Sequence, residues 1–116
     1  MKQARQGDVF IRKIDKINTE GLTEVKRDRK AFVLAYGEVT GHMHALYGEG
    51  TALLENEEGT RFLSLEKETT LFHGNYGDTK GTTADHDPIT LPAGDYEVRI
   101  QKEYDWFKEE LRNVAD

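Results

Sequence analysis

Apolar and polar residues alternate over most of this chain, and this period of two is the feature that most limits its fold. Segments of four to ten residues rich in Val, Ile, Phe, Tyr, Thr and Leu are separated by turns of Gly, Asn or Asp. Such alternation predicts half-buried β-strands, because successive side chains of a strand point to opposite faces of a sheet. The expected strands are 8–14, 31–38, 42–47, 51–56, 60–66, 69–73, 88–91 and 95–104.

Eight short strands at nearly regular spacing favour an all-β fold, either a compact small barrel or a two-sheet sandwich of the cupin-like or jelly-roll-like kind. We expect one domain over residues 1–116, since no long polar linker divides the chain. Tyr96, Val98 and Ile100 share one face of the last strand and are expected in the core. Residues 105–116 predict a short C-terminal helix, because their apolar side chains recur at helical spacing.

Charge is distributed unevenly along the chain, whose formal net charge is −6. Residues 1–30 carry nine Lys or Arg against five Asp or Glu, whereas residues 31–116 carry seven against seventeen. Because so acidic a body repels phosphate backbones, nucleic acid is a disfavoured partner. Cysteine is absent, which excludes disulfides and thiolate metal ligands. No apolar segment approaches the roughly 20 residues of a membrane span, so we expect a cytoplasmic protein without membrane contact.

Two of the four histidines stand one residue apart, in the segment GEVTGHMHALYGEG of residues 37–50. In an extended strand His42 and His44 project from the same face, about 6.5 to 7 Å apart, so both imidazoles can reach one ion. Without cysteine, the other ligands of such an ion would be His, Asp or Glu. The predicted ligands of a divalent metal (Zn, Fe, Ni or Mn) are His42, His44, His86, His73 and Glu49.

The chain resembles a group of small, uncharacterised bacterial and phage proteins with the pattern QGDV…GE-TGH-H…EH-PI-LP-G-Y-V-Q-EY…V-D. The matching stretches are GDV at 7–9, GEVTGHMH at 37–44 and DHDPITLPAGDYEVRIQKEYD at 85–105. The resemblance covers most of the chain, includes His42, His44 and His86, and implies no activity. Twelve residues separate His73 from His86 here, where the group has a short link, so His73 is the least secure ligand.

A weaker similarity is to the cupins, whose first motif runs G-x5-H-x-H-x3,4-E-x6-G and whose second contains P-x-G. His42, His44 and Glu49 match H-x-H-x4-E, and residues 92–94 match P-x-G. The upstream glycine spacing is one residue short, and Glu97 stands where the second motif has its histidine. This similarity concerns the fold and does not settle the chemistry.

The first functional hypothesis is a small histidine-rich metal-binding protein, used either for binding alone or as a metal-dependent enzyme. His42, His44 and His86 would hold the ion, with Glu49, His73 or Glu97 as a further ligand. As an enzyme the chain would be a hydrolase or perform cupin-type chemistry, two classes that these residues do not separate. In a hydrolase, Glu103 or Asp87 would serve as the general base for a metal-activated water.

Two alternatives need no metal. One is an RNase in which paired histidines act as acid and base, with phosphate contacts from Lys26, Arg27 or Arg99. The other is a regulatory module that binds a small molecule or a protein partner at the barrel mouth without catalysis. The aromatic walls of that mouth would be Tyr36, Tyr47, Tyr76 and Trp106. A homo-oligomer is compatible with every one of these functions.

Overall fold

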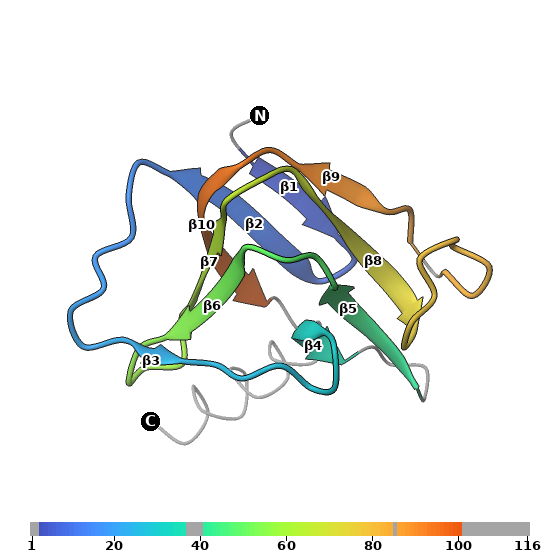
Figure 1. Cartoon of the computed structure of the whole chain (residues 1–116), viewed down its shortest axis with the longest axis horizontal. Coiled ribbons are helices and arrows are strands. Elements are labelled where there is room, and N and C mark those ends of the chain that lie inside the picture. The colour runs from blue at the N-terminus through green and yellow to red at the C-terminus, as the bar shows by residue number, and fades with distance from the viewer. Residues whose placement is uncertain (1–2, 37–40, 85, 101–116) are drawn as a thin grey trace, which may run out of the picture.

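The computed structural model describes residues 3–36, 41–84 and 86–100 of the chain. These residues form ten strands and no helix, which confirms the all-β expectation (Figure 1). The strands are β1 Gln3–Gln6, β2 Val9–Ile14, β3 Thr23–Glu24, β4 Phe32–Tyr36, β5 His42–Leu46, β6 Thr51–Glu55, β7 Arg61–Leu65, β8 Thr69–Asn75, β9 Ile89–Leu91 and β10 Gly94–Ile100. The helix expected over residues 105–116 lies outside the described residues. The described part of the chain also contains no helix that is long and apolar enough to span a membrane.

All eight predicted strands are present, and two further strands were not predicted. β1 has the sequence QARQ and β3 consists of two exposed residues, so neither carries the apolar alternation that marks a half-buried strand. Both exist through pairing: β1 with β2 across a tight turn, and β3 with β6. The strand conformation of β1 and β3 therefore depends on pairing at the two edges of the sheet, which the local sequence does not indicate.

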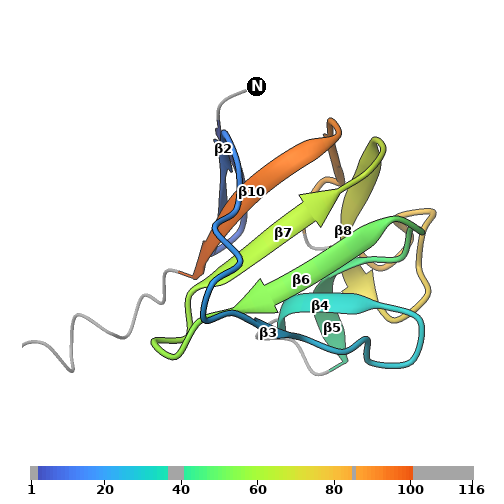
Figure 2. The ribbon, with the colours of Figure 1, turned by 60° about the vertical axis from the view of Figure 1, so that its left-hand side comes forward.

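The strands form two antiparallel sheets that share one core. The six-stranded sheet has the order β1-β2-β10-β7-β6-β3, and the four-stranded sheet has the order β4-β5-β8-β9. Figure 2 shows β2, β10, β7 and β6 in one layer, with β5 and β8 behind it. Leucines from both sheets meet in the main hydrophobic cluster, among them Leu53 and Leu63 of the first sheet and Leu46 and Leu71 of the second, all four fully buried. Burying one such side chain contributes about 1.5 to 3 kcal/mol.

The core face of β10 was predicted correctly for two of its three residues. Tyr96 and Val98 are buried in the main cluster. Ile100, in contrast, is 37% exposed, because it stands at the rim of a cavity where β10 reaches the end of the sandwich. The core along β10 therefore ends at Val98, two residues before the end that the alternation of the sequence indicated.

Candidate histidine site

The centre of the candidate site is a pair of stacked imidazoles between two strands of the smaller sheet. β5 and β8 pair in a register that sets His44 directly opposite His73. Directly opposed residues of an antiparallel pair have Cβ atoms about 5 Å apart, and here the rings stack with centroids 3.8 Å apart and planes inclined by 10°. Both residues are buried, and His44 shares its face of β5 with the core residue Leu46. The pair therefore extends the core.

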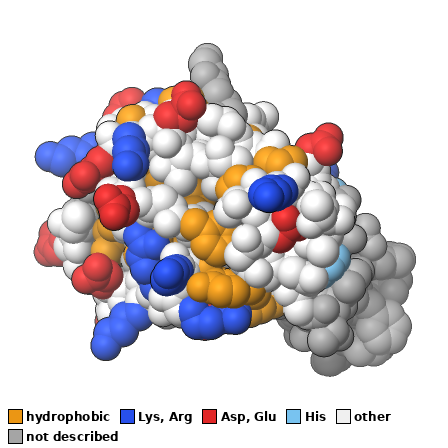
Figure 3. Space-filling view, turned by 45° about the vertical axis from the view of Figure 1, so that its right-hand side comes forward, with side chains coloured by type: hydrophobic (Ala, Val, Ile, Leu, Met, Phe, Trp, Pro, Cys, Tyr) orange, Lys and Arg blue, Asp and Glu red, His pale blue; other side chains and the backbone are white. Residues whose placement is uncertain are grey.

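The other two histidines meet the same pair. His86, in the loop before β9, stacks on His73 with ring centroids 5.0 Å apart and planes 12° apart. His42 meets His73 edge-on, at 6.1 Å and 84°. The structure thus brings together all four imidazoles, and His73, which the sequence left least secure, lies at their centre. His86 is exposed whereas His44 and His73 are buried, and only a small area of histidine reaches the surface in Figure 3.

The long link between His73 and His86 is organised by one carboxylate. Asp78 accepts hydrogen bonds from the backbone nitrogens of Gly81 (3.0 Å) and Thr83 (2.7 Å), among others, and from the Thr83 hydroxyl. These bonds, those to Thr83 above all, hold the pKa of Asp78 well below its ordinary value. The Thr83 Oγ1 in turn accepts a bond from the Asn75 backbone nitrogen at 2.9 Å, which closes the loop onto the end of β8. The loop therefore turns back toward β8, which places His86 in contact with His73.

Gln6, at the end of β1, fixes the tautomer of His44. Its side chain is buried, and its Nε2 donates to the backbone oxygens of Leu71 and Asp87, each at 3.0 Å. With both amide protons used, the Gln6 Oε1 faces His44 Nδ1 at 2.8 Å, so the ring must donate there. A neutral His44 then has its lone pair on Nε2. This is the orienting role that outer-shell partners play for metal-binding or catalytic histidines.

The turn after β1 adds a carboxylate to the site. His44 Nε2 lies 3.5 Å from Asp8 Oδ1. The turn comes close to the rings because Gly7 has φ +59° and no side chain: a Cβ there would lie 3.0 Å from His86 Nε2 and 3.3 Å from His44 Cε1. His44, His86 and Asp8 therefore border the same short piece of backbone.

This arrangement suits a cation. A lone pair at His44 Nε2 facing the negative charge of Asp8 is unfavourable unless a positive charge lies between them. A proton on the ring or a metal ion would supply that charge. A carboxylate so close to the ring would favour either form of that charge.

The stacking limits which rings can share an ion. Donor lone pairs lie in the plane of an imidazole, and nearly parallel planes such as those of His44, His73 and His86 have no common point near the rings. Consistent with this, no group of three or more His, Cys, Asp or Glu within residues 3–36, 41–84 and 86–100 is arranged to hold a metal ion. A metal centre here requires at least one ring to turn.

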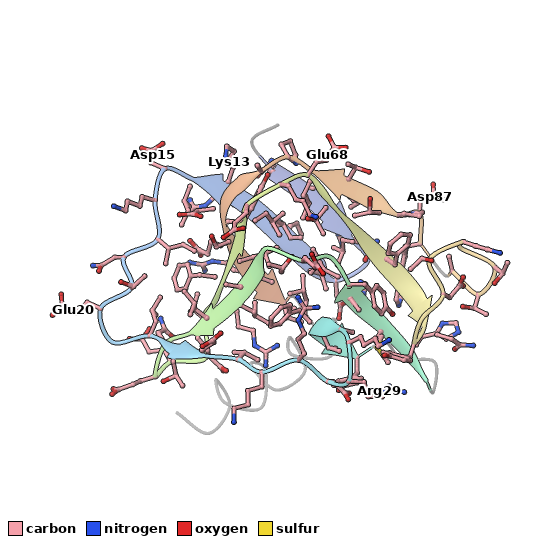
Figure 4. All side chains as sticks on the ribbon, viewed as in Figure 1. Lys13, Asp15, Glu20, Arg29, Glu68 and Asp87 are labelled. Carbon is pink, nitrogen blue, oxygen red and sulfur yellow. The ribbon has the colours of Figure 1, made fainter. Side chains whose placement is uncertain are left out.

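The remaining predicted site residues are not gathered with the histidines. Glu49 is exposed in the turn between β5 and β6. Asp87 contributes its backbone oxygen to Gln6, while its side chain is exposed and projects outward (Figure 4). Glu97 lies on the face of β10 opposite the core, where ion pairs with Arg99 and Arg12 lower its pKa. Glu103 is outside the described residues.

The cations predicted for an RNase are largely committed to the fold. Arg27 donates to the Gly48 backbone oxygen at 2.9 Å and lies over the ring of Phe32. Arg99 is paired with Glu97. Of the three, only Lys26 has neither a hydrogen bond nor an ion pair within the described residues. Two of the three cations predicted to contact phosphate are therefore already engaged by protein groups.

The aromatic residues predicted for a ligand-binding mouth divide into two groups. Tyr47 and Tyr76 contact each other with ring centroids 5.9 Å apart, and the Tyr47 hydroxyl accepts a bond from the Gly77 backbone nitrogen, so both have structural roles. Tyr36 is 66% exposed and lines a cavity at the end of the sandwich. Trp106 lies outside the described residues.

Comparison with known proteins places the chain in a family. Residues 5–101 match the family described as a domain of unknown function, DUF8820. The chain belongs to the DUF8820 family. No curated protein and no solved structure matches it. The match shows an uncharacterised domain family, whereas the specific sequence pattern of the resembling group and the similarity to cupins stay predictions. The description of DUF8820 assigns no activity.

Two residues of the site in this DUF8820 chain, Gln6 and Asp8, were not predicted from the sequence. Gln6 and Asp8 come from the stretch QGDV, which is part of the pattern of the resembling proteins, but a lone amide and a lone carboxylate carry no spacing that points to histidines more than thirty positions away. Only the turn between β1 and β2 brings them there.

Proposed function

We propose that this DUF8820 chain binds one divalent transition-metal ion between His44 Nε2, the Asp8 carboxylate and His86 Nε2. The observation that carries the proposal is the 3.5 Å separation of His44 Nε2 and Asp8 Oδ1. Metal–nitrogen and metal–oxygen bonds of about 2.0 to 2.2 Å at a tetrahedral angle put two ligands about 3.4 Å apart. The pair is therefore spaced as two ligands of one ion.

The surroundings of His44 support this use. The Gln6 amide holds the ring with Nε2 toward Asp8, and such outer-shell bonds orient ligands and raise their basicity. Imidazole together with carboxylate suits Zn, Fe, Ni or Mn, whereas Mg and Ca prefer oxygen ligands alone. The chain has no thiolate that would compete for the ion.

Completing the site requires one movement, a rotation of His86. Its ring is exposed and lies in a loop, so turning about its side-chain torsions costs little, whereas the buried His44 is held by Gln6. The Gly7 backbone, next to Asp8, already has His86 Nε2 beside it. Binding would thus take His86 out of the stack, and His42, whose ring is perpendicular to the stack, is the natural fourth ligand.

Catalysis would be a second step of the same proposal. If three protein groups hold the ion, a water in the open position would be acidified, which is the basis of a metal-dependent hydrolase. Cupin-type chemistry would use the same ligands with iron. Binding is tested first, because both activities depend on it.

The test is the metal content and metal affinity of untagged full-length protein. We expect close to one equivalent of Zn, Fe, Ni or Mn by mass spectrometry, and tight binding of Zn²⁺ or Ni²⁺ to the metal-free chain by calorimetry. Asp8→Asn and His86→Ala should each weaken affinity by more than the about 10- to 100-fold that loss of an outer-shell partner costs. Asp87→Asn removes an exposed carboxylate next to His86 and is the matched control, which should bind like the unaltered chain.

Two results would contradict the proposal. One is a folded protein that takes up no stoichiometric metal from any of several media and shows no calorimetric binding. The other is equal affinity in Asp8→Asn and Asp87→Asn, since the ion would then be held elsewhere.

A further inference from the structure

A cavity of about 770 Å³ opens between the two sheets at the end where β2 begins and β10 stops. This volume is in the range of sites that take small molecules. Its apolar wall includes Leu34 of β4 and Val98 of β10. Tyr36 and Ile100, the two exposed large hydrophobic side chains of the described residues, line it as well. The cavity therefore collects apolar surface that the described fold leaves uncovered.

The charged lining of this cavity is mainly acidic. Its carboxylates outnumber its cations, with Asp8, Asp28, Glu55 and Glu58 against Lys26, Arg61 and Arg99. Two of these cations are already engaged by protein groups. Arg61 donates to the backbone oxygens of Val33 and Leu34 at 3.1 and 3.3 Å, and Arg99 is paired with Glu97, which does not line the cavity. An anionic ligand would therefore meet several carboxylates and one uncommitted cation.

Glu55 and Glu58 supply negative charge where β6 turns into β7. Glu58 stands exposed in that turn, and its carboxylate has neither a hydrogen bond nor an ion pair within the described residues. Glu55 has Arg61 Nε at 3.9 Å, a distance at which a partly exposed pair is weak. Both carboxylates can therefore face a further cation.

Tyr36 adds an aromatic ring beside a third carboxylate. Its hydroxyl donates to Asp28 Oδ2 at 2.8 Å. The other oxygen of Asp28 lies 3.5 Å from Arg29 Nε, in an exposed pair that neutralises the carboxylate only weakly. Aromatic rings attract cations through their π electrons, and carboxylates attract them through charge. This part of the lining therefore favours an ammonium group over an anionic one.

We infer that this cavity binds a small protonated amine with an apolar body, its ammonium group among the carboxylates and its body on Leu34, Val98 and Ile100. Charge complementarity selects this class, because a neutral molecule of the same shape would use the apolar wall alone. The inference goes beyond the proposed metal site and does not depend on it, since the lining acts in the same way in the metal-free chain.

Calorimetry on the full-length protein, freed of metal with EDTA and dialysed, tests this inference. The probes share a phenylethyl body and differ in the head group: phenethylamine, phenethyl alcohol and hydrocinnamate. The amine should bind at least about fivefold more tightly than the alcohol, and hydrocinnamate should bind more weakly than the alcohol, because several partly exposed carboxylates act together on the head group. Raising the ionic strength to about 1 M should remove most of this preference, since salt screens exposed charges.

Two variants locate the head group and the body of the ligand. Glu58→Gln should weaken phenethylamine binding severalfold and leave phenethyl alcohol binding unchanged, because it removes a charge and keeps the shape. Glu57→Gln is the matched control, since Glu57 is the adjacent exposed carboxylate and does not line the cavity. Ile100→Ala should weaken the binding of both probes by a similar factor, because both use the apolar wall.

Several results would overturn the inference. If phenethylamine does not bind, or binds no more tightly than phenethyl alcohol, the charges of the lining do not select the ligand. If hydrocinnamate binds most tightly, the cavity takes anions. Equal effects of Glu58→Gln and Glu57→Gln would place the amine outside the cavity. None of these results bears on the metal proposal, which is decided by metal uptake.

Discussion

At the scale of single residues, Gln6 shows how one buried polar side chain can set the chemistry of a site. Its amide joins three parts of the chain: the end of β1, the backbone of β8 and the loop before β9. Its oxygen decides which nitrogen of His44 carries the proton. A side chain so placed is at once a structural bond and a positioning residue.

Leucine is similar in size to glutamine but forms no hydrogen bonds, so replacing Gln6 with leucine tests what its hydrogen bonds contribute to stability. Gln6→Leu should lower the free energy of unfolding by about 1 to 3 kcal/mol, because the buried Leu71 carbonyl loses its donor and a buried unsatisfied group costs that much. Urea denaturation measures the change. Gln3→Leu, on the exposed part of the same strand, is the control and should be near neutral. Equal stability of the two variants would mean that the Gln6 bonds contribute nothing.

At the scale of elements, the loop between β8 and β9 depends on Asp78. The loop has no apolar core of its own, and its backbone donors converge on one ionised carboxylate. Because these donors favour the charged form, the pKa of Asp78 in the folded chain is below its unfolded value. Its contribution is therefore complete above the ordinary carboxyl pKa of about 4 and is lost as the pH falls toward the lowered folded value.

Asp78→Asn should loosen this loop without unfolding the sheets. An amide offers one acceptor oxygen in place of two, so the backbone amides of Thr82 and Thr83 should exchange with solvent on the order of tenfold faster at pH 7. Nuclear magnetic resonance of both proteins at matched pH provides the comparison. The difference should shrink below about pH 4. Asp15→Asn, at the periphery (Figure 4), should leave those rates unchanged, and the same acceleration there would refute the role of Asp78.

At the scale of the whole molecule, the candidate site lies where the two sheets meet. Asp8 follows β1 in the six-stranded sheet, whereas His44 and His86 belong to the four-stranded sheet and the loop that leads into it. An ion held by all three would cross-link the sheets in the folded state only. Metal binding should therefore raise the stability of the whole sandwich by mass action.

Thermal unfolding should show this coupling directly. Zn²⁺ at 100 times its dissociation constant adds about 2.7 kcal/mol, which for a chain of this size corresponds to a rise in Tm of about 10 °C. Mg²⁺ at the same concentration should produce no shift, and Asp8→Asn should lose most of the zinc shift. A similar zinc shift in Asp8→Asn would show that the ion does not join the sheets through that carboxylate.

The sequence by itself determined the strand content, because the period of two is a local property that half-buried strands need wherever they pair. It also indicated His42 and His44 as neighbours on one strand face, for the same reason. β1 and β3 could not be predicted, since polar edge strands owe their existence to a partner rather than to their own pattern.

Only the tertiary structure decided how the site is built. It chose the register that opposes His44 to His73, the turn that brings Gln6 and Asp8 to the rings, and the loop that returns His86 across twelve residues. It also places Glu97 away from the histidines, on the outer face of β10, where Glu97 forms ion pairs with Arg12 and Arg99. Contacts between distant segments depend on register and sheet order, and these are fixed by the shared packing of the core rather than by any one stretch of the chain.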